Sequence, residues 1–216
     1  MPVPGPLGSL GASPPAKPDI PSQHSVVTIG DTSSPSEPAA PRRAPTEAGG
    51  FGDELALAAA YYLDHEPRGA RNDCSGFVCA AWARTGHDLA GNTRSLWELA
   101  RDEGVVHRRK RPSPGDLAFF DNTYDRNGNG RRDDELTHIA IVIEVFEDGT
   151  ILMAHGGTSK GRTELRMNLA KRDVQTGEEG QVLNDILRRR GRDDPESIPT
   201  LAGELWRGFA SLRPAT

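Results

Sequence analysis

The sequence predicts an α+β domain with N-terminal helices packed on a small antiparallel sheet. Segments in which apolar residues recur at helical spacing come first, over residues 53–102. The run 138–146 is rich in Ile and Val, which is typical of a strand. The turn 147–149, Glu-Asp-Gly, joins it to a second apolar run at 150–154 as a hairpin. Helices followed by such a meander indicate an α+β order rather than alternating βαβ units.

Composition divides the 216 residues into a linker and one domain. Residues 1–50 are crowded with Pro, Ser, Ala and Gly and contain no aromatic residue. Such a segment cannot bury enough apolar surface to offset the entropy lost on ordering, so we expect a disordered linker. The remaining residues, 51–216, are enough for one domain of ordinary size.

The expected elements follow in chain order. The helical pattern marks three segments: 53–65, 73–84 and 92–102. Asp53 is the expected N-cap of the first helix, and Asp73 or Cys74 that of the second. A Pro-Gly turn then precedes the strand 116–120. Beyond the hairpin we expect a strand at 165–169, a helix at 182–190 and a closing segment at 205–212. The polar stretch 121–137 reads as an insertion between two strands.

Charge and hydropathy exclude two classes of partner. The net charge of −5 offers no basic excess to neutralise phosphates, so nucleic acid is not an expected partner. No window approaches the roughly 18 apolar residues of a membrane span. The N-terminus lacks a basic segment followed by an apolar core, so no signal peptide is visible and the compartment stays unknown.

The residue pattern around Cys74 points to nucleophilic chemistry. Cys74 opens a predicted helix, His138 begins a predicted strand, and His155 follows the next apolar run across a hairpin. A thiolate forms more readily at a helix N-terminus and beside an imidazolium, so we expect the pKa of Cys74 to be lowered. His138 is then the expected base and His155 its orienting partner. Cys79, within an apolar helical stretch, is the expected core thiol.

Other interpretations of these residues stay open. A cysteine at a helix start is more often inert than catalytic when it is considered alone. A Cys/His/His set can also bind zinc in a structural protein, although paired C-x-x-C or H-x-x-H spacing and a fourth ligand are missing. A non-catalytic binding module is a third alternative.

Three blocks in order resemble the NlpC family of papain-like bacterial cell-wall cysteine peptidases. They are Asp-Cys-Ser-Gly-Phe-Val at 73–78, Pro-Gly-Asp-Leu-Ala-Phe-Phe at 114–120 and His-Ile-Ala-Ile-Val at 138–142. The resemblance covers about residues 53–157. The related CHAP amidases share the Cys-to-His arrangement and come second, because their cysteine context usually differs. The Trp-Gly-Gly-like segment common in NlpC-type proteins before the cysteine is missing here.

The resemblance implies a papain-like fold and a thiol hydrolase acting on peptidoglycan stem peptides, with no cofactor required for catalysis. It implies Cys74 as nucleophile, His138 as base and His155 as third member. Asp73, Ser75 and Tyr62 are the substrate-binding residues it suggests. The implied reaction is endopeptidase cleavage between D-glutamate and a diamino acid; a CHAP-like N-acetylmuramoyl-L-alanine amidase is the alternative. A periplasmic or secreted location is expected from the resemblance.

The insertion 121–137 contains a pattern of oxygen-bearing side chains. Their spacing matches the first nine residues of a calcium-binding loop, which carries oxygen ligands at positions 1, 3, 5 and 9 and a glycine at position 6. The residues at the four ligand positions are Asp125, Asn127, Asn129 and Asp133. Position 12 is Leu136 instead of a bidentate Glu, and two arginines within the loop oppose cation binding. The alternatives are a structural Ca²⁺ site and a mobile polar loop.

Overall fold

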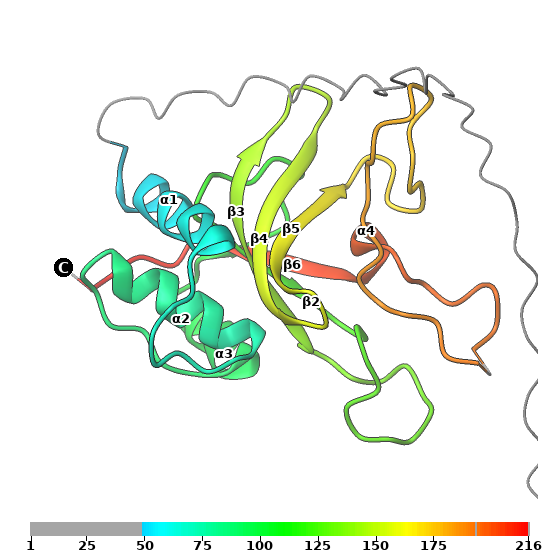
Figure 1. Ribbon diagram of the computed structural model, residues 1–216, viewed down its shortest axis with the longest axis horizontal. Helices are drawn as coiled ribbons and strands as arrows, with labels where there is room; N and C mark the ends of the chain where they lie inside the picture. Colours follow the sequence, from blue (N-terminus) through cyan, green and yellow to red (C-terminus); the bar gives the residue numbers. More distant parts are fainter. Residues whose placement is uncertain (1–48, 193, 216) are drawn as a thin grey trace, which may run out of the picture. The chain divides into compact units, whose positions relative to one another are not determined.

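Six strands form one antiparallel sheet in the computed structural model, which describes residues 49–192 and 194–215. The spatial order of the strands is β1-β6-β2-β3-β4-β5 (Figure 1). Their bounds are Val106–His107 for β1, Leu117–Phe120 for β2, His138–Val145 for β3, Thr150–Thr158 for β4, Gly161–Asn168 for β5 and Trp206–Ala210 for β6. The sheet and its helices confirm the predicted α+β class.

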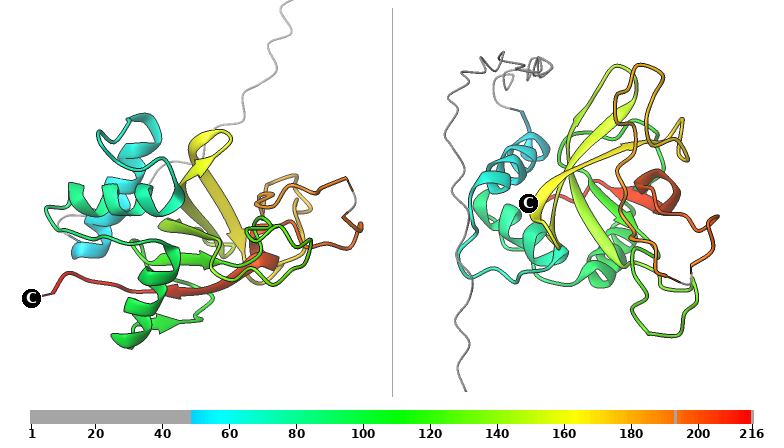
Figure 2. Two further views of the ribbon diagram at one scale, coloured as in Figure 1. Left: turned by 90° about the horizontal axis from the view of Figure 1, so that it is seen from below. Right: turned by 45° about the vertical axis from the view of Figure 1, so that its right-hand side comes forward.

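Helices cover one face of this sheet, and a long C-terminal segment covers the other. The helices are α1 Phe51–Asp64, α2 Cys74–Arg84, α3 Thr93–Asp102 and the single turn α4 Ala202–Leu205. Figures 1 and 2 show α1, α2 and α3 together on one side, with α4 and its flanking loops on the opposite side. None of the helices in the described part of the chain is long and apolar enough to span a membrane.

Strand alternation divides the core into two clusters. Because successive side chains of a strand point to opposite faces, Phe119 and Ile141 pack with the helices, whereas Phe120 and Val142 pack on the other face. The second cluster also receives Met167 of β5 and residues from α4 and β6. Both faces are therefore buried, which explains why all four residues of β2 are inaccessible.

Of the three longer helices, two begin at a residue whose side chain caps the helix. Asp73 caps α2, since its Oδ1 accepts a hydrogen bond of 2.6 Å from the Gly76 N–H. Asn92 and Ser95 form a capping box at the start of α3. The prediction of Asp53 as N-cap is wrong: α1 begins at Phe51 after Gly50, and Asp53 lies within the first turn. A carboxylate there still favours the helix through the dipole.

The C-terminal third contains one wrong prediction. No helix forms over 182–190; its backbone pairs with other segments instead, through Asp185 N–H to Arg166 O and Leu187 N–H to Thr200 O. Asn184 is buried; its Oδ1 accepts from the Asn168 N–H, and its side-chain amide donates to the carbonyl oxygens of Lys171 and Val174. Tertiary pairing thus overrides a moderate helical propensity.

The predictions for the C-terminal strands and for the N-terminal linker have different outcomes. The strand expected at 165–169 is present as the end of β5, and the closing segment expected at 205–212 contains β6, which lies between β1 and β2. The described residues fall within one compact unit, Pro45–Thr216. The linker prediction for 1–50 falls almost entirely outside the described residues.

Candidate active site

Cys74 is the first residue of α2, and the glycine two positions later fixes how the chain enters this helix. A Cβ at Gly76 would lie 2.2 Å from the carbonyl oxygen of Arg71. Only glycine therefore allows the 71–73 loop to pass across the helix start. The glycine of the Asp-Cys-Ser-Gly block is therefore needed for the local fold, whereas the cysteine is the candidate for chemistry.

Three other elements surround the start of α2. The Cys74 sulfur lies 3.6 Å from Oγ1 of Thr93, the first residue of α3. The backbone N–H of Ile139 in β3 also faces the sulfur. From β4, Gly157 comes so close that a Cβ there would lie 2.5 Å from the Cys74 nitrogen. Cys74 is thus held where α2, α3, β3 and β4 converge.

His138 and His155 form a buried pair on neighbouring strands. Nε2 of His138 lies 2.7 Å from Nδ1 of His155, and the ring planes are nearly perpendicular at 89°. Both residues are almost fully inaccessible, with relative exposures of 7% and 4%. The structure therefore brings together the two predicted histidines at the start of β3, one residue from the Ile139 amide that faces Cys74. No hydrogen bond joins Cys74 directly to His138 among the described residues.

The electrostatics of the site favour neutral groups. Burial raises the pKa of the Cys74 thiol; hydrogen bonds from Thr93 and Ile139 offset this only in part, and the Asp73 carboxylate raises it further. Burial lowers the pKa of His138 well below 6.5, with a further lowering by His155. Burial also lowers the pKa of His155 to about 4. The expectation of a thiol pKa lowered by an adjacent imidazolium is therefore contradicted, because burial raises the pKa of the thiol and lowers the pKa of both rings, which disfavours an imidazolium at neutral pH.

The three residues predicted to bind substrate have different surroundings. Ser75 is buried; its hydroxyl donates to Asp73 Oδ1 at 2.8 Å and accepts from Arg71 Nη2 at 3.0 Å. Asp73 remains about half exposed. Tyr62 is half-buried on α1 and, with Gly76, lines a pocket on the other side of α2. Asp73 and Ser75 thus lie together at the helix start, while Tyr62 lies apart from the thiol.

The Pro-Gly-Asp block at 114–116 connects several elements of the fold and is not part of the candidate site. Asp116 is fully buried, accepts from Ser211 Oγ at 2.7 Å and pairs with Nε2 of His107 at 3.1 Å. It thereby ties β2 to β1 and to the segment that follows β6. Gly115 has φ +79°, and a Cβ there would lie 2.2 Å from the Gly52 carbonyl oxygen in α1. This glycine lets the turn pack against α1.

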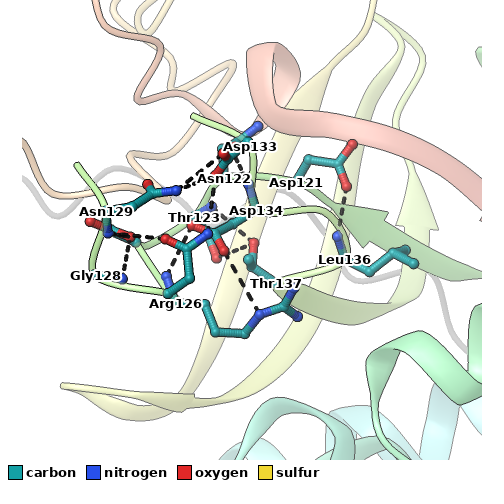
Figure 3. Close-up of polar contacts among 12 residues, drawn as sticks. Asp121, Asn122, Thr123, Arg126, Gly128, Asn129, Asp133, Asp134, Leu136 and Thr137 are labelled. Atoms are coloured by element: carbon teal, nitrogen blue, oxygen red, sulfur yellow. Dashed lines mark hydrogen bonds and ion pairs between the residues drawn. The ribbon is translucent and has the colours of Figure 1, made fainter. Parts of the chain in front are cut away.

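The predicted calcium loop is closed by hydrogen bonds of its own (Figure 3). Asp125 accepts from the backbone N–H groups of residues 128–130. Asp133 accepts from the side-chain amides of Asn127 and Asn129, which lowers its pKa. The four predicted ligands thus lie together, but the two carboxylates already accept N–H donors. Calcium binding stays a prediction, and isothermal titration that shows no heat at millimolar calcium would remove it.

Sequence reasoning missed Thr93, Gly157 and Arg71 around the nucleophile. Thr93 follows an Asn that reads as a helix cap, so its sequence context predicts only a helix start. Gly157 is recognisable as one of two consecutive glycines after His155. Neither pattern predicts that Thr93 and Gly157 contact the start of α2, because their positions depend on how α3 and β4 pack.

The fold and this site define an α+β domain in which the sulfur of a helix-start cysteine faces a strand that begins with one of two paired histidines. Residues 65–157, less than half of the chain, match the CHAP domain family. The matched segment contains Cys74, His138 and His155, and it supports a CHAP or papain-like cell-wall hydrolase that acts on peptidoglycan. Searches of curated proteins and of solved structures gave no match.

The family match bears on the earlier alternatives. The CHAP relationship, placed second from the sequence, is the one that the match supports, and the NlpC-type assignment is not confirmed. For a zinc-binding protein, three or more ligands must lie together. Across residues 49–192 and 194–215, no group of three or more His, Cys, Asp or Glu is arranged to hold a metal ion.

Proposed function

We propose that this protein is a cysteine hydrolase that cleaves amide bonds in peptidoglycan stem peptides, with Cys74 as nucleophile and His138 as general base. The observation that carries the proposal is the buried His138–His155 pair at the strand start that flanks the Cys74 sulfur. Two adjacent buried imidazoles need each other to satisfy their polar nitrogens. This pairing would fix the orientation of His138 as a triad partner does.

The neutral resting state sets the order of proton transfers. If Nε2–H of His138 donates to Nδ1 of His155, Nδ1 of His138 keeps its lone pair and is the basic nitrogen. As the Cys74 sulfur attacks the carbonyl carbon, its proton passes to this nitrogen. The imidazolium then protonates the amine as the C–N bond breaks, leaving a thioester. Water, deprotonated by the same ring, attacks the thioester, and the proton returns to the departing thiolate.

The oxyanion formed during attack would be stabilised at the start of α2. The Cys74 N–H has no hydrogen-bond partner among the described residues and lies at the positive end of the helix. Such an amide is suited to the charge that develops on the carbonyl oxygen. The Thr93 hydroxyl, 3.6 Å from the sulfur, is a second polar group at the reacting atoms.

For the scissile bond, we propose cleavage between D-glutamate and the diamino acid. The alternative is an N-acetylmuramoyl-L-alanine amidase, and the CHAP match is compatible with either an amidase or a peptidase. Mass spectrometry of products from purified muropeptides separates the two, because the new amine appears on the diamino acid in the first case and on L-alanine in the second.

The test of the function compares wild type and Cys74→Ala on defined stem peptides and on muropeptides. We expect fragments from wild type only, with equal thermal stability of the two proteins. A wild type that binds peptidoglycan but releases no fragment would instead support the binding-module alternative. Cleavage by Cys74→Ala at the wild-type rate would remove Cys74 as nucleophile.

A further inference from the structure

A pocket of about 450 Å³ lies on the face of α2 that helical spacing places opposite Cys74. Its floor is a face of α2 formed by Gly76, Cys79, Ala80 and Ala83, which recur at helical spacing. Its walls come from the end of α1, the loop 67–71 and the loop 89–91. The three segments that form the walls also position α2, the helix that begins with Cys74.

The charged side chains that line this pocket are both arginines, Arg68 and Arg71. Arg71 is already engaged, since it donates to Ser75 Oγ at 3.0 Å and to the Gly91 carbonyl and pairs with Asp73 at 3.5 Å. Arg68 makes no hydrogen bond or ion pair with any described residue. Its guanidinium is thus a cationic group with donors available to a ligand, in a pocket whose lining contains no carboxylate.

The pocket is within reach of a substrate that lies across the start of α2. Gly76, in its floor, is only two residues from Cys74. A helix with its side chains is about 10 Å across, and an extended peptide spans roughly 3.3 Å per residue. About three residues of an extended stem peptide would therefore connect the reacting carbonyl to the pocket.

We propose that this pocket is a substrate subsite that binds a free carboxylate of the stem peptide through Arg68. A guanidinium binds a carboxylate through two parallel N–H donors, which gives geometric selectivity over an amide. Arg71, fixed by Ser75 and Gly91, forms the wall beside it, and Tyr62 supplies an apolar face. The identity of the ligand rests on the proposed function, whereas the anion selectivity rests on the pocket itself.

Cys79 is only partly buried and lines the pocket, so the expectation of a core thiol is wrong and Cys79 provides a direct reporter of pocket occupancy. The chain contains two cysteines, so Cys79 is the one thiol left in a Cys74→Ser variant. We expect a stem tripeptide with free carboxylates to slow alkylation of Cys79 by a maleimide at least fivefold, and its fully amidated counterpart to leave the rate unchanged. Adding Arg68→Gln should abolish the protection, and adding Arg101→Gln, at an exposed arginine of α3, should preserve it.

Kinetics give the second readout. For an active enzyme, kcat/KM should be roughly 10-fold higher for the carboxylate substrate than for the amide, and Arg68→Gln should bring this ratio close to one, in line with the strength of charge-assisted hydrogen bonds. The proposal is overturned if the tripeptide gives no protection, or if Arg68→Gln leaves protection or the substrate ratio unchanged. An inactive wild type would refute the proposed function alone, since the protection experiment needs no turnover.

Discussion

At the scale of single residues, the proposed mechanism depends on the paired imidazoles of His138 and His155. Removing His138 should lower kcat/KM by about 10²–10⁴-fold, the usual contribution of general acid–base catalysis. His155→Ala should have a smaller effect, and His155→Gln should retain more activity, because an amide can still hydrogen-bond to the His138 ring. His87→Ala, at an exposed histidine, is the matched control. Equal activity of His155→Ala and wild type would exclude an orienting role for His155.

The same pair predicts a loss of stability in weak acid. The pKa of His155 is about 4 in the folded protein against 6.5 ordinarily, so the unfolded chain binds its proton at higher pH. The free energy of unfolding is therefore unaffected by this group above pH 6.5 and falls as the pH drops from 6.5 towards 4. The full decrease is roughly 3 kcal/mol. Urea unfolding between pH 7.5 and 4.5 measures it. His155→Gln should flatten the decline, and an unchanged slope in that variant would contradict the assignment.

The raised pKa of Cys74 predicts slow alkylation in the resting protein. A buried neutral thiol should react more slowly with iodoacetamide at pH 7 than a free cysteine does, and its rate should rise only at higher pH than for the free thiol. Mass spectrometry resolves the modification of Cys74 from that of Cys79. A fast rate persisting at pH 6 would show a preformed thiolate, and the proton would then already reside on His138.

Residue identities in the site were largely predictable, but their electrostatics were not. The helix-start cysteine and the strand-start histidine follow from local patterns around Asp73 and Ile139. Whether a thiol or an imidazole is charged depends on burial, which arises when α2 packs on β3 and β4. The sequence predicted that the dipole of α2 would lower the pKa of Cys74. It did not predict the burial, which has the larger effect and raises this pKa.

At the scale of elements, the contact between β4 and the start of α2 is the most sensitive. Gly157 has φ +70°, and a Cβ there would meet the Cys74 backbone nitrogen. Gly161, in the same β4–β5 hairpin, has φ +80° and open space around it. Alanine at either position bears the cost of a left-handed conformation, about 1–2 kcal/mol. Only Gly157→Ala adds a backbone clash.

Gly157→Ala should therefore lower Tm by at least twice as much as Gly161→Ala, which should cost a few degrees. Gly157→Ala should also abolish hydrolysis of stem peptides, whereas Gly161→Ala should keep it. Calorimetry and the peptide assay give the two readouts. Equal effects of the two substitutions would mean that the hairpin adjusts without moving the nucleophile.

Elements with strong local signals were predicted correctly, and elements formed by long-range pairing were not. β3 has an uninterrupted Ile/Val pattern, and α2 has a capping Asp. By contrast, β1 is only two residues long and exists because it pairs with β6. The segment 182–190 has helical composition, but Ile186 pairs with Leu201 and Leu183 is buried.

At the scale of the whole molecule, the family match and the folding unit do not coincide. The match ends at residue 157, yet Met167 and Phe209 fill the second core cluster. A fragment ending at residue 157 should therefore lack a cooperative unfolding transition and bind the dye ANS, which reports exposed apolar surface. The fragment 45–216, the compact unit, is the control and should unfold cooperatively. Cooperative unfolding of the shorter fragment would show that the matched segment folds alone.

The position of β6 has a consequence for how this protein is made. This strand is the last one in the sequence, but it lies between β1 and β2, and the Ser211 that follows it binds the buried Asp116. Cys74 and both histidines leave the ribosome well before residue 210 does. Until β6 arrives, β2 presents an unpaired edge and the sheet beneath the helices is incomplete. A nascent chain would therefore carry all three candidate catalytic residues without a working site, and activity would begin only when synthesis of the domain is finished.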